Sequence, residues 1–258
     1  MEWQDEAIVL SLRRHGETAS IVEALTREHG RHLGLVHGGA SSKARATWQP
    51  GNRVRLVWRA RLADHLGSYV AELARARASA MFETAAALAG LNAFAAIAST
   101  VLPEREPHRA AFEAGEALLD AMADHDATDW LPLYARWEAG LLDELGFGLD
   151  LASCAATGAT ENLSHVSPRS GRAVSAVAAE PYKDRLLILP PFLRGSGEPA
   201  TGADVVAGLA LTAHFLDQRV MAPHGKSMPE ARRRLHDLAV KVTNANANGS
   251  QMSAAGHV

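Results

Sequence analysis

Apolar and polar side chains alternate along the first 80 residues with the period of two that is typical of β-strands. Ile8, Leu10 and Leu12 lie on one face of the first such strand. Further strands follow at residues 19–26, 33–36, 53–62 and 69–73, and turn signals such as Pro50-Gly51 separate them. Five short strands in about 75 residues predict a small β-barrel of the OB or SH3-like kind.

From residue 78 onward the pattern becomes helical. Stretches rich in alanine and leucine predict helices over residues 81–101, 108–123 and 130–145, and two more over residues 203–220 and 229–242. Residues 150–180 contain small residues and glycines without a clear period, which predicts a compact irregular insert. The tail from residue 243 has low complexity and predicts disorder.

The composition is that of a folded protein rather than a disordered one, because 47% of the 258 residues are hydrophobic and 21% are charged. No run of about 18 apolar residues is present to span a membrane. The acidic N-terminus lacks the features of a signal peptide. A single cysteine, Cys154, permits neither an internal disulfide nor a four-cysteine zinc site. We therefore expect a cytoplasmic protein.

The net charge of −3 hides an uneven distribution along the chain. Residues 1–80 carry 12 basic and 8 acidic side chains, whereas residues 81–160 carry 3 basic and 13 acidic ones. Residues 161–258 carry 11 basic and 8 acidic side chains. Such a division predicts that different segments have different partners.

The predicted strand at residues 53–62 has one basic face. Arg53, Arg55, Arg59 and Arg61 occupy alternate positions, and apolar side chains, including Trp58, point the other way. Successive side chains on one face of a strand lie roughly 6.6 Å apart, which is close to the spacing of phosphates along an extended single strand. This face therefore predicts binding to a polyanion, with affinity that falls as salt rises.

The basic surface extends into the neighbouring segments of the chain. Residues 27–61 contain eight basic side chains and a single acidic one, Glu28. The eight basic residues are the predicted DNA-binding residues: Arg27, Arg31, Lys43, Arg45, Arg53, Arg55, Arg59 and Arg61. Trp48 and Trp58 are candidates for stacking on bases, although the inward position of Trp58 favours a place in the core. The alternative is a solvated strand face that carries its charge without a ligand.

Other possible sites are weaker. His29, His32 and His37 have metal-like spacing, but nothing completes a metal shell except Glu28, so solvated turn histidines are the favoured interpretation. Cys154 with His165 is a possible nucleophile pair, again without a supporting motif. We predict no catalytic residue, no metal and no cofactor.

The sequence alone leaves open the roles of two sets of charged side chains. The acidic side chains of residues 104–124 are typical of solvated helix faces, and such a surface equally suits repulsion of DNA or a basic partner. The last predicted helix begins with a run of three arginines, Arg232, Arg233 and Arg234. This run is either a second contact for DNA or an acidic peptide, or a solvated turn.

Several segments, in order, carry a family resemblance. They are residues 3–14, with Ala7-Ile8-Val9-Leu10; His15-Gly16-Glu17-Thr18; Leu25-Thr26-Arg27-Glu28-His29-Gly30-Arg31; Leu35-Val36-His37-Gly38-Gly39; Gln49-Pro50-Gly51; residues 59–67; and Trp137-Glu138 through Leu145-Gly146-Phe147-Gly148-Leu149-Asp150-Leu151. Together they resemble the RecO recombination mediators of bacterial DNA repair. Ser167-Pro168-Arg169-Ser170-Gly171-Arg172-Ala173-Val174-Ser175 and Leu189-Pro190-Pro191-Phe192-Leu193 are similar to the α-proteobacterial branch.

The resemblance implies an α+β multidomain fold with an N-terminal OB-fold β-barrel, an α-helical domain and a small irregular insert like a degenerate zinc finger. The corresponding boundaries are residues 1–78 for the OB domain, 79–148 with 200–242 for the helical domain, 149–199 for the insert and 243–258 for the disordered tail.

The resemblance also implies a non-enzymatic role in recombinational repair by the RecF pathway. Members bind single- and double-stranded DNA, anneal complementary strands without ATP, and join RecR. They also contact the acidic C-terminal tail of single-strand binding protein and help load RecA onto coated DNA. This implies a cytoplasmic, nucleoid-associated protein without a membrane partner.

This chain departs from the zinc-bearing members of the family. Where those members have two Cys-x-x-Cys pairs, this chain has Cys154 with Thr157 and Ser175 with Ala178. One sulfur ligand does not hold a structural zinc, so we expect a zinc-free insert.

Two further function classes compete with the mediator. One is an adaptor whose basic OB face binds acidic protein segments, since an OB fold does not by itself fix function. The other is a hydrolase or nuclease, for which no paired carboxylates or metal cluster fall on one site. Competition between an acidic peptide and an oligonucleotide separates the mediator from the adaptor.

Overall fold

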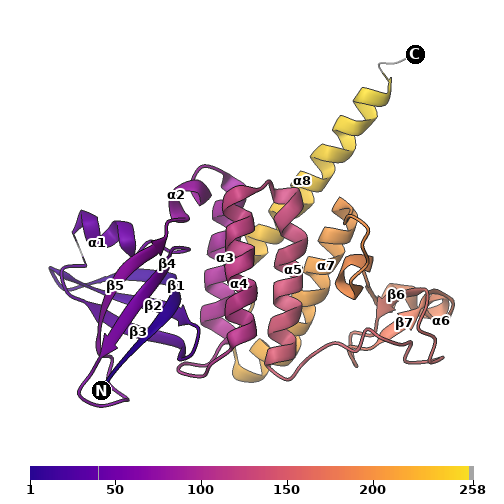
Figure 1. The fold of residues 1–258 in the computed structure, drawn as a ribbon. Helices are drawn as coiled ribbons and strands as arrows, with labels where there is room; N and C mark the ends of the chain where they lie inside the picture. Colours follow the sequence, from indigo (N-terminus) through magenta and orange to yellow (C-terminus); the bar gives the residue numbers. More distant parts are fainter. Residues whose placement is uncertain (40, 256–258) are drawn as a thin grey trace. The chain divides into compact units, whose positions relative to one another are not determined.

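The computed structural model describes residues 1–39 and 41–255, without the side chains of residues 43 and 245–255. The chain divides into two compact units, Met1–His125 and Asp126–Val258. Figure 1 follows the chain through both. Each unit is described separately below.

The first unit begins with the barrel that the sequence predicts. Its strands are β1 (Glu2–His15), β2 (Ala19–Thr26), β3 (Gly30–Val36), β4 (Arg53–Arg59) and β5 (Ser68–Arg75), and they close in the order β1-β2-β3-β5-β4. Strands β3 and β5 are parallel, and the other neighbours are antiparallel. The OB-type barrel is therefore confirmed, with β4 ending three residues earlier than predicted.

The barrel encloses a core of small and aliphatic side chains together with Trp48, Trp58 and Tyr69. Trp48 follows α1 (Ser42–Thr47), a short helix between two of the predicted strands, where the sequence pattern predicts no element. Trp48 and Trp58 are 3% and 2% exposed. The inward position of Trp58 is confirmed, but the prediction that either indole is available for base stacking is wrong because both fill the core.

Three helices complete the first unit: α2 (Ala78–Met81), α3 (Ala85–Val101) and α4 (Arg109–Asp124). Buried Arg77 joins α4 to the end of β5, since its two Nη atoms each donate to a Glu116 oxygen at 2.9 Å and its Nε donates to Asp120 at 2.5 Å. The Asn52 side-chain oxygen accepts hydrogen bonds from the backbone amides of Arg77 and Ala78. Part of the predicted acidic helix face is therefore engaged with arginines.

The second unit packs α7 (Gly202–Phe215) against α5 (Ala127–Glu144) and α8 (Glu230–Ala255). In α5, Leu131, Tyr134, Trp137 and Leu141 are buried at helical spacings of three and four residues. A π-helical turn, η3 (Leu216–Met221), follows α7, and a single 3₁₀ turn, η4 (Ala222–His224), comes next. Thr201 and Asp204 form a capping box that starts α7.

The insert of the second unit is a small sheet with the strand order β7-β6-β8. Its strands are β6 (Leu163–Val166), β7 (Ala173–Ser175) and β8 (Leu187–Ile188), and short turns α6 (Ala176–Ala179), η1 (Glu180–Arg185) and η2 (Pro191–Arg194) surround them. Strands of two to four residues are too short to show a period, which explains why the sequence predicts an irregular segment here.

Cys154 lies buried inside this insert and accepts a hydrogen bond from the Ser175 amide at 3.2 Å. The other positions where zinc-bearing proteins carry thiols hold Thr157, Ser175 and Ala178. One thiol, two hydroxyls and a methyl group are a poor donor set for structural zinc, so the residues present do not fit that metal.

The C-terminal segment differs from the sequence prediction. Helix α8 continues through the segment for which the sequence predicts disorder as far as Ala255, and residues 256–258 lie outside the described part. The predicted domain boundaries at residues 78, 148, 199 and 242 stay a prediction. Among the described residues, no helix combines the length and apolarity needed to cross a membrane.

Candidate nucleic-acid interface

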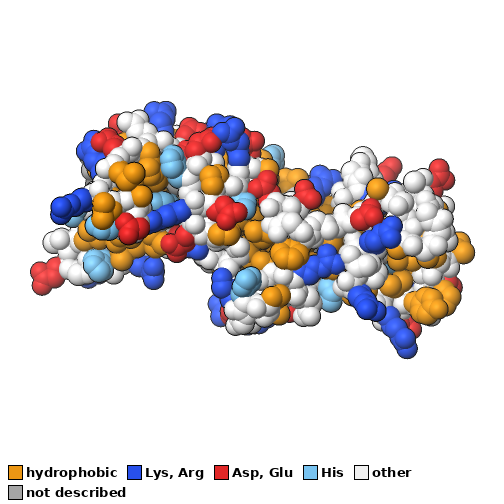
Figure 2. Space-filling model, turned by 90° about the horizontal axis from the view of Figure 1, so that it is seen from below, with side chains coloured by type: hydrophobic (Ala, Val, Ile, Leu, Met, Phe, Trp, Pro, Cys, Tyr) orange, Lys and Arg blue, Asp and Glu red, His pale blue; other side chains and the backbone are white. Residues whose placement is uncertain are grey.

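The outer surface of β4 is the centre of the candidate interface. The burial of this strand alternates as predicted, with Val54, Leu56 and Trp58 inside the barrel and Arg55 and Arg59 exposed. Lys, Arg, Asp and Glu side chains are interspersed over the barrel in Figure 2. The barrel surface in this view therefore carries both signs of charge.

Acidic side chains from outside β4 neutralise two of its arginines. Arg59 pairs with Glu2 of β1, with Nη2 to Oε1 at 3.0 Å, and this contact lowers the pKa of Glu2. Arg53 contacts Glu6 of β1 and also Glu116 of α4, with Nη1 to Oε2 at 3.1 Å. Both arginines therefore offer a phosphate less charge than an unpaired guanidinium does.

Arg55, Arg61 and Arg45 are the predicted residues that remain available. Arg55 is exposed between Glu6 of β1 and Glu72 of β5 in the sheet register. Arg61 is exposed in the loop after β4, and Arg45 is exposed on α1. Among the described residues, none of these three guanidinium groups forms an ion pair or a hydrogen bond.

Arg27 and Arg31 serve other contacts in the same unit. Arg27 donates to Glu113 of α4 at 2.7 Å. Arg31 donates to Glu23 at 2.7 Å and to the Leu102 carbonyl at 2.8 Å, and its side chain is only 14% exposed. Arg31 thus fastens the segment after α3 to the barrel.

Lys43 is the remaining predicted residue. Its backbone belongs to α1, and its side chain lies outside the described residues. The Ser41 hydroxyl accepts a hydrogen bond from the Ala44 amide and starts this helix. The helix therefore sets the backbone positions of residues 43 and 45.

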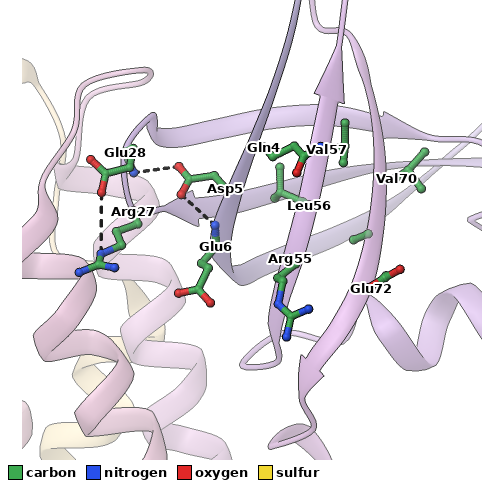
Figure 3. A pocket seen from close by; sticks show the side chains of 11 residues that line it. Gln4, Asp5, Glu6, Arg27, Glu28, Arg55, Leu56, Val57, Val70 and Glu72 are labelled. Carbon is green, nitrogen blue, oxygen red and sulfur yellow. Dashed lines mark hydrogen bonds and ion pairs between the residues drawn. The ribbon is translucent and has the colours of Figure 1, made fainter.

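A hollow of about 640 Å³ runs along the outer surface of β1, β4 and β5 (Figure 3). Val57 and Val70 line it between the charged side chains of Arg55, Glu6 and Glu72. Val70 is 62% exposed, so the hollow offers apolar surface to solvent. The hollow combines an apolar strip with both signs of charge.

The expectation of solvated turn histidines is wrong for His32, which lies on β3, whereas His29 does lie in the turn between β2 and β3, with its side chain 35% exposed. His32 is 3% exposed, and His29 stacks on Trp3 with ring centroids 4.0 Å apart. The sequence does indicate that Trp3 and Asp5, the neighbours of His29, point inward, because Trp3, Asp5 and Ala7 occupy alternate positions of β1 on the side that faces the core. No cluster of three or more metal-ligating side chains occurs in the described part of the chain.

Two family models match this chain, one after the other along the sequence. The family model described as "Recombination protein O N terminal" matches residues 1–77, and the model described as "Recombination protein O C terminal" matches residues 83–228.

Curated relatives match over nearly the full length. A protein of Rhodospirillum centenum named "DNA repair protein RecO" is 55% identical over 92% of this chain and 94% of its own length. Proteins with the same name from Phenylobacterium zucineum and Cereibacter sphaeroides are 53% and 51% identical, over 90% and 93% of this chain and 95% and 99% of their own lengths.

Proposed function

Since the chain belongs to the RecO family of bacterial DNA repair proteins, we propose that it is a recombination mediator whose barrel binds the phosphate backbone of single- and double-stranded DNA. The family membership places it in DNA repair and recombination, in a family that is generally non-catalytic.

The unpaired arginines of the barrel are the observation that carries this proposal. Arg45, Arg55 and Arg61 are exposed on the domain that matches the N-terminal family model, and no acid pairs with them among the described residues. Guanidinium groups bind phosphate oxygens well because their planar N–H groups match that geometry. Arg27, Arg31, Lys43, Arg53 and Arg59 remain in the proposed set, with a smaller share for those that are already ion-paired.

The mechanism that follows is electrostatic. Cationic side chains on the barrel neutralise the phosphates of two complementary strands, so that the strands approach and pair without ATP. We propose that the protein works in the RecF pathway with RecR, contacts the C-terminal tail of single-strand binding protein, and so helps RecA to load onto coated DNA. These roles place it in the cytoplasm with the nucleoid.

Fluorescence anisotropy of a labelled single-stranded oligonucleotide tests the DNA-binding step. The purified protein is titrated against it from low to physiological salt. We expect tight binding at low salt and a linear fall of log K with log salt concentration. Absence of binding at low salt would contradict the proposal.

An adaptor role is a second candidate, and the hollow in Figure 3 favours it. The exposed Val70 and the half-buried Val57 suit an apolar side chain of a protein partner, and Arg55 suits an acidic residue beside it. An acidic peptide and an oligonucleotide are added together to the protein. Mutual displacement indicates that they share this face, whereas peptide binding without any DNA binding favours the adaptor.

A further inference from the structure

Three aromatic rings form a ladder at one end of the barrel. Trp3 stacks on His29 with centroids 4.0 Å apart and planes 6° from parallel, and Trp3 lies 5.5 Å from Trp58 at 20°. Trp58 is buried, whereas Trp3 is half-buried and the His29 side chain is 35% exposed. The ladder therefore runs from the core to the surface and ends in a partly exposed ring.

A cavity of about 280 Å³ lies beside this ladder. Its wall includes Trp3, His29, His32, Trp58, Ala63 and Arg105. Pockets that enclose drug-sized ligands span about 300–1,000 Å³, so this cavity suits a smaller planar group. Among the described residues, the indole N–H of Trp3 has no hydrogen-bond partner, which leaves a donor in the wall.

His29 is held in place by a buried acid. Its Nδ1 lies 2.9 Å from Oδ2 of Asp5, whose side chain is 4% exposed. The same Asp5 oxygen accepts a hydrogen bond from the Glu28 amide at 2.8 Å. The orientation of the outermost ring is thus fixed by the barrel, so that a stacking partner needs to order little of the protein on binding.

Arg105 also lines the cavity. Its guanidinium donates to the carbonyls of Ala63, Asp64 and His65 at 2.7, 3.2 and 3.0 Å and so fixes the loop between β4 and β5. Arg105 also has a positive φ of 62°, which is costly for a residue with a side chain. A strained residue that holds a loop around a cavity is typical of a built binding site.

The charges at the rim do not exclude a nucleic acid. Glu2 pairs with Arg59, and Glu28 pairs with Arg109. Deeper in the cavity, burial is the main cause that lowers the pKa of His32 to about 4, so its ring is neutral at physiological pH. The free Arg61 belongs to the same loop as Ala63. An aromatic wall beside an unpaired arginine suits a base with its adjoining phosphate.

We propose that this cavity receives an unpaired nucleobase of single-stranded DNA, which stacks against the Trp3–His29 ladder. The inference rests on the proposed DNA-binding function and adds a base-stacking site to its phosphate contacts. Stacking of this kind accepts every base because each has a π-face. Capture of single bases holds a strand with its remaining bases exposed, which suits a protein that pairs complementary strands.

Abasic DNA separates base stacking from phosphate contact. The affinities of the full chain for a labelled oligothymidylate and for an oligomer of the same length with abasic residues are compared by anisotropy at one salt concentration. Both carry the same number of phosphates. Stacking of about 1–3 kcal/mol per base predicts a preference of roughly 5- to 150-fold for the oligothymidylate.

The variants His29→Ala, His29→Phe and His37→Ala locate the effect. His29→Ala removes the outer ring of the ladder and should cut the preference severalfold, whereas His29→Phe retains a ring and should keep most of it. His37 is exposed and lies outside the cavity, so His37→Ala should leave the preference unchanged. Circular dichroism checks that each variant is folded.

The outcomes are distinguishable from those of the proposed function. Equal binding of both oligomers by the wild type, or a preference unaffected by His29→Ala, would overturn the stacking site and leave phosphate binding intact. Absence of binding to either oligomer would overturn both the site and the proposed function.

Discussion

The carboxylate of Glu138 in α5 accepts two hydrogen bonds from Arg232 in α8, from Nε to Oε1 at 2.6 Å and from Nη2 to Oε2 at 2.8 Å. Their side chains are 0% and 1% exposed. The Thr212 hydroxyl of α7 donates to the same carboxylate at 2.5 Å. One buried ion pair therefore connects three helices of the second unit.

Substitution of Arg232 by alanine should strongly destabilise the second unit. Loss of one partner leaves the Glu138 charge buried without compensation, which costs about 3–5 kcal/mol. Urea denaturation followed by circular dichroism measures the loss as a lower midpoint.

Arg234→Ala is the matched control for this substitution. Arg234 is exposed and pairs with Glu230 four residues away on the same helix, a contact worth about 0.3–0.5 kcal/mol. We expect the urea midpoint of the Arg234→Ala variant to stay close to that of the wild type. Similar losses in the two variants would show that burial does not decide the contribution of these arginines.

The unpaired arginines of the barrel should set the salt dependence of DNA binding. Replacement of Arg55 or Arg61 by alanine removes one phosphate contact each, which should flatten the slope of log K against log salt by about 0.7 per contact on a single strand. Anisotropy titrations at several salt concentrations measure the slope.

Arg31→Gln provides the contrast. Its guanidinium is engaged by Glu23 and the Leu102 carbonyl, so the substitution should lower the stability of the first unit and flatten the slope less than Arg55→Ala or Arg61→Ala does. A slope unchanged in Arg55→Ala and Arg61→Ala would instead remove β4 and its following loop from the proposed interface.

The sequence predicts the barrel because the alternation of β4 is visible within one strand. The acids that neutralise Arg53 and Arg59 are not visible there, because Glu2 and Glu6 belong to β1 and Glu116 lies 63 positions after Arg53. Charge counted along the chain therefore overstates the free charge of the surface. The strand pairing, which a single sequence does not specify, decides which arginines remain available.

The buried Arg232 of the second unit is a second case in which the sequence does not reveal the partner of a charge. A run of three arginines indicates a solvated or DNA-contacting turn, yet its first member is buried beneath α7 because Glu138 provides a partner in α5. Helical periodicity places Glu138 one turn from Tyr134 and directly after Trp137, but does not reveal its cation. Partners that lie 94 positions apart become evident only in the folded chain.

His32 should stay neutral in the folded chain down to about pH 4. Burial, aided by the nearby positive charges of Arg105 and His29, lowers its pKa from 6.5 to about 4. NMR of ¹⁵N-labelled histidine rings measures this titration, and His32→Asn assigns the signal. Titration of this ring near pH 6.5 would contradict the buried position.

The same shift makes stability depend on pH in one direction. Between about pH 6.5 and 4 an unfolded chain binds a proton at residue 32 that the folded chain does not bind. The free energy of unfolding should therefore fall as the pH decreases through this window, and the effect should be absent above it. His32→Asn should reduce this dependence by up to about 1.4 kcal/mol per pH unit.

Purified protein should contain no stoichiometric zinc. Cys154 is the single cysteine of the chain, and its sulfur accepts a hydrogen bond from the Ser175 amide, so a zinc ion would find one thiol ligand where a structural site needs four ligands. Elemental analysis after dialysis without chelator measures the metal. One zinc per chain would overturn the zinc-free insert.

Gly30→Ala should destabilise the first unit far more than Gly16→Ala. Both glycines have a similar positive φ, 68° and 66°, so the backbone strain of alanine, about 1–2 kcal/mol, is common to both. At Gly16 an added Cβ meets nothing within 4 Å, whereas at Gly30 it falls 2.1 Å from the backbone oxygen of Glu106. A backbone atom does not rotate away as a side chain does, which adds about 1–3 kcal/mol.

Thermal unfolding of the two variants separates these effects. A larger drop in midpoint for Gly30→Ala means that the β2–β3 turn packs closely against the segment before α4, where the Arg105 amide donates to the Arg31 carbonyl at 2.8 Å. Since Arg105 lines the cavity beside His29, the same substitution should also weaken the preference for base-bearing DNA. Equal drops at both glycines would mean that this close approach does not exist in solution, and the wall formed by Arg105 would lose its support.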